Sequence, residues 1–117
     1  MKAQSLSGSL WQLHNIDNIE TGKSNVIDKE VKLSLMFDSD SVYSGIACTS
    51  YKGKYNAVDN KKISMRKADA VTPTCLGISV LQKEVLEMYL KVTRYRVDNG
   101  KLFLFTSDDH RMVFHKK

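Results

Sequence analysis

The two cysteines are the residues of this chain with the widest range of chemistry open to them. Cys48 and Cys75 are the only two in 117 residues. A bond between them would close a loop of about 27 residues and would stabilise the fold by roughly 3.5 kcal/mol, on the chain-entropy argument. Two thiols that stay reduced would instead pack as small apolar residues. Both alternatives remain open, and we expect the two residues to be neighbours in space.

Redox and metal chemistry find little support in the spacing of these residues. The separation of the two cysteines excludes a CxxC redox pair, and no histidine lies at ligand spacing from either one. Asp38 with Asp40, and Asp108 with Asp109, could hold a calcium ion, but such pairs are typical of solvated turns. We therefore predict no bound metal and no cofactor.

Catalytic motifs are also missing from the sequence. Ser107, Asp108 and His110 are the residue types of a hydrolase triad, but they are neighbours on one expected turn. In a triad the acid that orients the histidine comes from elsewhere in the fold, and the serine needs an oxyanion site. The chain contains no Gly-x-Ser-x-Gly, no P-loop and no dinucleotide-binding glycine motif. We expect no catalytic residues and a protein that is not an enzyme.

Basic and aromatic residues alternate in two segments, at 51–55 and 94–96. This pattern could form a stacking platform for single-stranded nucleic acid. The charge is uneven as well: residues 1–48 hold four lysines and six acids, net −2, while residues 49–117 hold fourteen basic residues and seven acids, net +7. However, no run exceeds two consecutive basic residues, and any amphipathic strand shows the same alternation. Nucleic acid is not an expected partner.

The composition is that of a single globular domain. Hydrophobic residues make up 42% of the chain and charged residues 26%, and the length suffices to bury one core. We expect the domain over residues 9–117, after a disordered or linker segment at 1–8. No apolar run approaches the roughly 18 residues of a membrane-spanning helix. No leader peptide is visible, so the expectation is either a cytoplasmic protein or one whose leader was removed.

Alternation of apolar and polar residues predicts most of the chain to be β-strand. Residues 31–37, for example, are apolar at every second position. Gly45 indicates a bulge, or a point where another element packs closely. Asn99-Gly100 is a tight-hairpin signal. We expect strands over 10–16, 31–37, 41–48, 49–56, 63–66, 92–97, 101–105 and 112–115, and a loop over 17–30.

One amphipathic helix interrupts the strands. Ser79 with Gln82 resembles a capping box, and apolar residues follow at helical spacing, including Val85, Met88 and Tyr89. We predict a helix over about 79–91. The fold class is therefore mostly β: a curled, barrel-like antiparallel sheet of about seven or eight strands, with this helix packed on it.

The strand predicted over 101–105 is apolar on both faces, because Phe103 and Phe105 alternate with leucines. One face must meet the core, and the other needs a cover. The helix is one candidate for that cover. The alternative is a hydrophobic groove between helix and sheet, lined by Phe103, Phe105, Met88 and Tyr89.

Several short motifs follow one another from about residue 9 to about residue 115. They are Leu10-Trp11-Gln12-Leu13; Phe37, Gly45-x-x-Cys48 and Gly53-x-Tyr55; Cys75 before the helix; and Tyr95-x-Val97, Leu102-x-Leu104 and Met112-Val113-Phe114. Together, in this order, they resemble the META/HslJ domain family. The chain departs from the family at Ala47-Cys48-Thr49, where Gly-Cys-Asn is usual, and at Pro73, ahead of the second cysteine.

The resemblance implies a setting and no reaction. Members of the family are typically bacterial cell-envelope proteins, often lipoproteins, linked to heat shock and antibiotic tolerance. No catalytic activity is established for the family, so the resemblance supplies no active site. It implies a periplasmic or outer-membrane-anchored protein, if an N-terminal signal was removed.

Two functions are expected on these grounds. The first is a non-enzymatic accessory or stress-response domain of the envelope that acts through an unidentified protein partner. The second is a carrier or sensor of a small hydrophobic ligand, such as a lipid, held between helix and sheet. We expect a monomer in either case.

Overall fold

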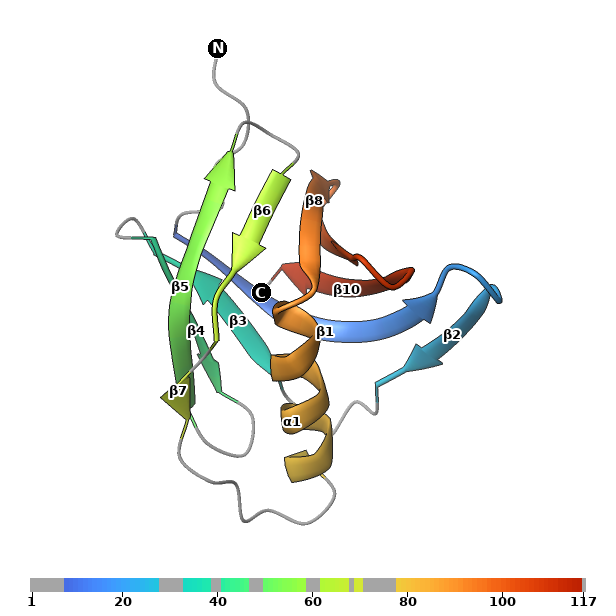
Figure 1. Cartoon of the computed structure of the whole chain (residues 1–117), viewed down its shortest axis with the longest axis horizontal. Helices are drawn as coiled ribbons and strands as arrows, with labels where there is room; N and C mark the ends of the chain where they lie inside the picture. The colour runs from blue at the N-terminus through green and yellow to red at the C-terminus, as the bar shows by residue number, and fades with distance from the viewer. Residues whose placement is uncertain are drawn as a thin grey trace.

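The computed structural model describes residues 8–27, 33–38, 41–46, 50–58, 62–67, 69–70 and 78–116. Short antiparallel strands make up most of this part of the chain, with one helix before the last three strands (Figure 1). In chain order the elements are β1 (Ser9–Asn18), β2 (Lys23–Val26), β3 (Ser34–Phe37), β4 (Val42–Ile46), β5 (Ser50–Val58), β6 (Lys62–Met65), β7 (Asp69–Ala70), α1 (Ile78–Tyr89), β8 (Val92–Asp98), β9 (Lys101–Thr106) and β10 (His110–Lys116).

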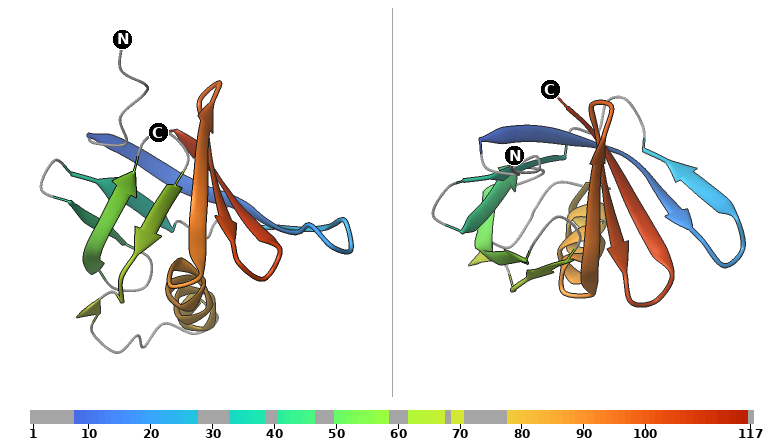
Figure 2. Two further views of the ribbon diagram at one scale, coloured as in Figure 1. Left: turned by 45° about the horizontal axis from the view of Figure 1, so that its top comes forward. Right: turned by 90° about the horizontal axis from the view of Figure 1, so that it is seen from above.

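Eight of the strands form a closed antiparallel barrel. Their order is β10-β9-β8-β6-β5-β4-β3-β1, and pairing between β10 and β1 closes the ring. The curvature is visible from above in Figure 2. Two short strands lie outside the ring, with β2 paired to β1 and β7 paired to β5. Closure removes the exposed strand edges of an open sheet, and it confirms the predicted curled, barrel-like fold.

The core lies inside the barrel and follows the alternation of the strands. On β3, Leu35 and Phe37 are buried while Met36 between them is exposed. On β9, Leu102 and Leu104 are fully buried in the same core cluster. The helix contributes Val85, Tyr89 and other side chains to that cluster. Burial of one face of each strand and one stripe of α1 is therefore the main stabilising term of the fold.

The hairpin between β8 and β9 is built as predicted. Asn99 and Gly100 both have positive φ, at 54° and 78°. Two consecutive positive φ angles are what a type I′ turn requires, and the twist of that turn matches the twist of the strands it joins. The Asn-Gly signal is confirmed.

The helix is confirmed, but it ends earlier than the expected residue 91. After Tyr89 the backbone tightens, because the amide of Leu90 bonds to the carbonyl of Glu87 and that of Lys91 to the carbonyl of Met88. Val92 is already buried at the start of β8. At 12 residues, the described helix falls short of what is needed to span a bilayer.

The loop prediction for residues 17–30 is wrong over much of its length. β1 continues to Asn18, and β2 pairs back onto it to form a hairpin. All four residues of β2 are exposed, so this strand lacks the apolar alternation that identifies a strand in a sequence. The segment expected to be a linker falls almost entirely on residues 1–7, which lie outside the described residues.

Candidate functional site

Two glycine–tyrosine pairs face each other across β4 and β5. Tyr43 lies opposite Gly53, and Gly45 lies opposite Tyr51. A Cβ on Gly45 would lie 2.0 Å from the carbonyl oxygen of Ser34 and 2.5 Å from the Tyr51 hydroxyl, and a Cβ on Gly53 would lie 2.8 Å from the Tyr43 hydroxyl. Each ring therefore occupies the space that a side chain opposite would need. The close approach predicted at Gly45 is confirmed.

The tyrosine hydroxyls join the sheet to the helix. Tyr51 donates a hydrogen bond to the Ser34 carbonyl at 2.6 Å, and its oxygen lies 3.0 Å from the Tyr89 hydroxyl. Because the single proton of Tyr51 points to Ser34, Tyr89 is the donor in the second contact. Tyr43 donates to the Arg66 carbonyl, and its ring meets that of Tyr89 edge-on at 5.5 Å. We call Tyr43, Tyr51 and Tyr89 the tyrosine cluster.

Tyr55, from the Gly53-x-Tyr55 motif, lies apart from the tyrosine cluster. Its ring packs edge-on against Phe37, with centroids 4.9 Å apart, and its hydroxyl donates to the Asp38 carbonyl at 2.9 Å. It is only partly buried at the edge of the core. Tyr55 therefore ties β5 to the end of β3.

Burial in the barrel suppresses ionisation of the three phenols of the tyrosine cluster. It raises the pKa of Tyr43 to about 12, and the nearby Asp69 carboxylate adds to the effect. Burial also raises the pKa values of Tyr51 and Tyr89 well above the ordinary 10. A phenol with a raised pKa in the folded state favours folding fully below pH 10, and that contribution is lost as the pH rises through the raised value.

We therefore expect the protein to lose stability from about pH 10 upward and to unfold cooperatively near or above pH 12. Tyrosinate absorbance followed against pH, together with far-UV circular dichroism, should show ionisation and unfolding as one coincident step. The same protein in concentrated urea should titrate near the ordinary pKa of about 10 and serves as the control. Gradual ionisation of most tyrosines near pH 10, with the dichroism unchanged, would contradict this expectation.

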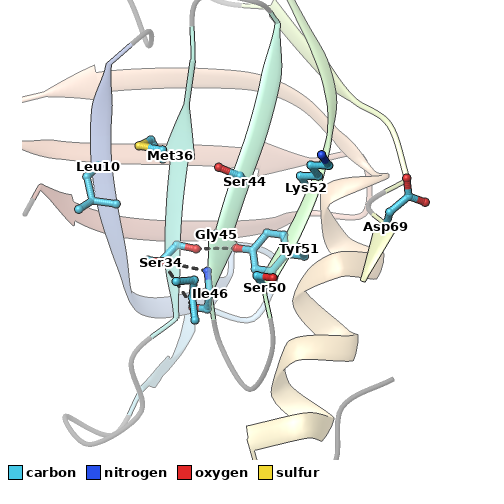
Figure 3. Close-up of a pocket in the computed structure, with 10 residues that line it drawn as sticks. All are labelled: Leu10, Ser34, Met36, Ser44, Gly45, Ile46, Ser50, Tyr51, Lys52 and Asp69. Carbon is cyan, nitrogen blue, oxygen red and sulfur yellow. Dashed lines mark hydrogen bonds between the residues drawn. The ribbon is translucent and has the colours of Figure 1, made fainter. Parts of the chain in front are cut away.

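An apolar groove lies on the outer face of the barrel, and Tyr51 of the tyrosine cluster lines it (Figure 3). Its volume is about 670 Å³. Three apolar residues in it are exposed, Leu10 at 40%, Met36 at 39% and Ile46 at 60%. The groove is lined by Leu10, Ser34, Met36, Ser44, Gly45, Ile46, Ser50, Tyr51, Lys52 and Asp69.

Strand register sets the order of residues along this groove. Leu10 pairs with Met36, Met36 with Ser44, Ser44 with Lys52, and Lys52 with Asp69. These five residues form one row across β1, β3, β4, β5 and β7, on the face opposite the core. The row runs from an apolar end at Leu10 to a charged end at Asp69.

The floor of the groove is a local break in the sheet. The amide of Ile46 donates to the Ser34 side-chain hydroxyl at 3.0 Å, and the Ser34 carbonyl accepts from Tyr51. Two hydroxyls thus replace backbone pairing between β3 and β4 beyond Met36 and Ser44. Since Gly45 has no side chain, the Tyr51 hydroxyl reaches from the core to the floor of the groove.

The four residues of the predicted helix–sheet groove are not brought together. Tyr89 is fully buried and Met88 packs beside the core cluster. Phe103 and Phe105 lie on the opposite face of β9, outside the barrel, because the leucines of that strand point inward. Arg94 stands over the Phe105 ring, at 5.2 Å from its centroid. Arginines from the two neighbouring strands, β8 and β10, therefore cover the outer apolar face.

The serine, aspartate and histidine near residue 108 form a structural turn. Asp108 accepts hydrogen bonds from the Thr106 hydroxyl at 2.5 Å and from Lys91 at 3.1 Å, and it contacts Nδ1 of His110 at 3.2 Å. These bonds, led by that from Thr106, hold the pKa of the Asp108 carboxyl well below its usual range. The cluster fixes the turn between β9 and β10.

Two of the predicted site residues fall outside the part of the chain that the structure describes. Cys48 and Cys75 lie outside the described residues, so the disulfide stays a prediction. Within the described part of the chain, no three histidine, cysteine or acidic side chains gather as metal ligands. Sequence analysis missed the outer groove, although exposed apolar residues at alternate strand positions, such as Met36, are a weak signal for one.

Comparison with known proteins gives a consistent result. A family model described as the META domain matches residues 4–117. An NMR structure of a protein from Burkholderia xenovorans is similar with a TM-score of 0.81 and 16% identity, over 96% of this chain and 83% of that one. A crystal structure of a DUF4847 family protein from Bacteroides vulgatus has a TM-score of 0.70 and 13% identity, over 94% and 93% of the two chains. No curated protein sequence matches this chain.

Proposed function

The chain belongs to the META domain family, and from this premise we propose that it is a non-enzymatic accessory domain of the bacterial cell envelope that acts by binding another protein. The single observation that carries this proposal is the exposed apolar groove over β1, β3 and β4. The proposed ligand of the groove is an apolar segment of a partner protein.

The clustering of the exposed apolar residues favours a binding role. Single exposed apolar side chains are normal on a protein surface, whereas a contiguous apolar patch beside polar residues is typical of an interaction site. Leu10 and Met36 are direct cross-strand neighbours, and Ile46 lines the same groove. Lys52 and Asp69 at the other end could orient a partner through charge.

The polar groups with strongly shifted pKa values support a role without catalysis. Asp108 is held by Thr106 and His110 at its own turn and by Lys91 from the segment after α1, and the hydroxyls of Tyr51 and Tyr89 bond to each other. The bonds of Asp108 fix the turn between β9 and β10, and those of Tyr51 and Tyr89 link the sheet to the helix, so each of these groups has a role in the fold.

A small hydrophobic ligand is the second candidate, and the size of the groove favours it. Its volume of about 670 Å³ falls in the range of roughly 300–1,000 Å³ typical of small-molecule sites. Such a ligand would lie in the outer groove. The space between helix and sheet, where we first expected it, holds the tyrosine cluster.

Site-specific photo-crosslinking tests the protein-binding proposal. We expect a photoreactive residue at Ile46 to give one discrete protein adduct with a bacterial envelope fraction. The same group at Val26, which is 64% exposed on β2 and outside the groove, is the matched control and should give no such adduct. Excess unlabelled protein should suppress the adduct, and excess Met36→Asp protein should not, because the charge makes the groove polar.

Two results would argue against the proposal. Equal adducts from positions 46 and 26, or equal competition by the Met36→Asp protein, would indicate contact unrelated to the groove. A native mass spectrum of the purified protein distinguishes binding of a small hydrophobic ligand from binding of a partner protein. A mass excess in the range of a fatty acid or phospholipid, lost on denaturation and absent from Met36→Asp, would favour ligand binding.

A further inference from the structure

A second surface of the barrel, centred on β8 and β9, combines arginine and phenylalanine. Lys62 pairs with Arg94 across β6 and β8, Arg94 pairs with Phe105, and Phe105 pairs with Arg111 on β10. Arg96 pairs with Phe103 in the next row. The strands lie side by side in both views of Figure 2.

Aromatic stacking holds the guanidinium groups of this surface in place. Arg94 lies 5.2 Å from the centroid of Phe105, and Arg96 and Arg111 lie 5.0 and 5.8 Å from that of Phe103. A guanidinium that lies over a ring keeps its N–H edges available to solvent. The rings therefore order the cations and leave their hydrogen-bond donors facing outward.

Carboxylates cancel only part of the positive charge. Arg111 binds one oxygen of the nearly buried Asp17 through Nε at 2.9 Å and Nη2 at 2.6 Å. Arg96 reaches Asp98 at 3.9 Å, and both side chains are 63% exposed. Such a long, exposed pair is weak. We define the basic face as Arg94, Arg96 and Lys101, all exposed on β8 and β9.

We propose that the basic face docks onto membranes rich in anionic phospholipid, with the lipid phosphates accepting hydrogen bonds from the arginines. Charge complementarity favours this partner: cations on neighbouring strands about 4.8 Å apart form a two-dimensional array, as do the headgroups of a bilayer. A single-stranded nucleic acid would instead present its charges along a line.

The stacking also argues against nucleic acid as the partner of this face. Base stacking, the main sequence-independent contact of single strands, needs an uncovered aromatic ring. The Phe103 and Phe105 rings already lie under guanidinium groups. The basic face therefore offers charge and donors, and little surface for stacking.

Vesicle sedimentation measures this binding directly. We expect the protein to partition onto vesicles of 30% phosphatidylglycerol in phosphatidylcholine at low salt, and to stay in solution with pure phosphatidylcholine. Each basic residue near an anionic bilayer contributes about fivefold to the partition coefficient. The double variant Arg94→Gln/Arg96→Gln should therefore bind about 10–25-fold more weakly.

A charge-matched variant provides the control. Lys23 on β2 and Lys83 on α1 are exposed and lie outside the basic face, so Lys23→Gln/Lys83→Gln should lower binding less than about threefold. Arg94→Lys/Arg96→Lys keeps the charge and should retain most of the binding even where loss of stacking weakens the fold. Circular dichroism checks that each variant is folded.

Three results would overturn the proposal. Equal losses in the two glutamine variants would mean that overall charge, and no particular face, drives binding. Tighter binding of a single-stranded oligonucleotide, with loss of that binding in Arg94→Gln/Arg96→Gln, would assign the face to nucleic acid. Full displacement from vesicles by millimolar inorganic phosphate at constant ionic strength would assign it to free phosphate.

Discussion

Replacing Gly45 with alanine is expected to destabilise the fold by about 3–5 kcal/mol, a large cost for one methyl group. The added Cβ would lie 2.0 Å from the Ser34 carbonyl oxygen and 2.5 Å from the Tyr51 hydroxyl. The first contact is with backbone, which cannot rotate away. The second is with a phenol held by its own hydrogen bond to Ser34. Urea denaturation monitored by circular dichroism measures the change in the free energy of unfolding.

Two other glycines serve as controls for this prediction. A Cβ in Gly53→Ala would first meet the hydroxyl and ring of Tyr43, at 2.8–3.0 Å, and the substitution should cost about 1–3 kcal/mol. Gly22→Ala meets nothing within 4 Å, and its φ of +76° alone should cost about 1 kcal/mol. Adding Tyr51→Phe to Gly45→Ala should not rescue stability, because the carbonyl contact remains. If Gly45→Ala cost no more than Gly22→Ala, the strands around Gly45 would be able to move apart and accommodate the added methyl group, and the prediction would be wrong.

The close packing at Gly45 illustrates what the sequence can and cannot predict. A glycine inside an apolar strand indicates that something approaches the backbone, and this much is local information. The approaching groups come from β3 and β5, and their alignment depends on strand register. Register is a property of the assembled sheet, so the tyrosine cluster could not be derived from spacing alone.

The outer groove was not predictable for the same reason. Leu10, Met36 and Ile46 are separated in sequence and become neighbours only through the pairing of β1, β3 and β4. Within its own strand each residue occupies an outward position, where a single apolar side chain is only a weak signal. A site composed of such residues is visible only after the barrel closes.

The cover of the apolar outer face of β9 was predicted only in part. Alternating leucine and phenylalanine correctly indicated that the second face needs a cover. The helix was one expected cover, yet Arg94 and Arg96 provide it from β8. Long cationic side chains can bury their stems along apolar surface and keep their charge in water. A sequence pattern does not distinguish this from coverage by a packed helix.

Replacing Tyr89 with alanine is expected to cost about 3–5 kcal/mol and to detach α1 from the barrel. Tyr89 is fully buried, and its ring centroid lies 5.5 Å from that of Tyr43 and 6.0 Å from that of Tyr51. Leu90, the next residue, is 50% exposed, and Leu90→Ala should cost less than about 1 kcal/mol. Urea denaturation gives both free energies, and amide hydrogen exchange in α1 should rise only in Tyr89→Ala. Similar costs for both variants would mean that the tyrosine cluster does not hold the helix.

The contributions of the individual hydroxyl groups of the tyrosine cluster to the free energy of unfolding can be separated in the same experiment. Tyr89→Phe removes one donor to Tyr51 and should cost about 1 kcal/mol. Tyr51→Phe deprives both the Ser34 carbonyl and the Tyr89 hydroxyl of a partner inside the barrel, and should cost about 2–4 kcal/mol. In the double variant no Tyr89 hydroxyl is left without its Tyr51 partner, so the cost of the double variant should fall below the sum of the two single costs. Strict additivity would imply that the contact between the two hydroxyls contributes nothing to docking of the helix.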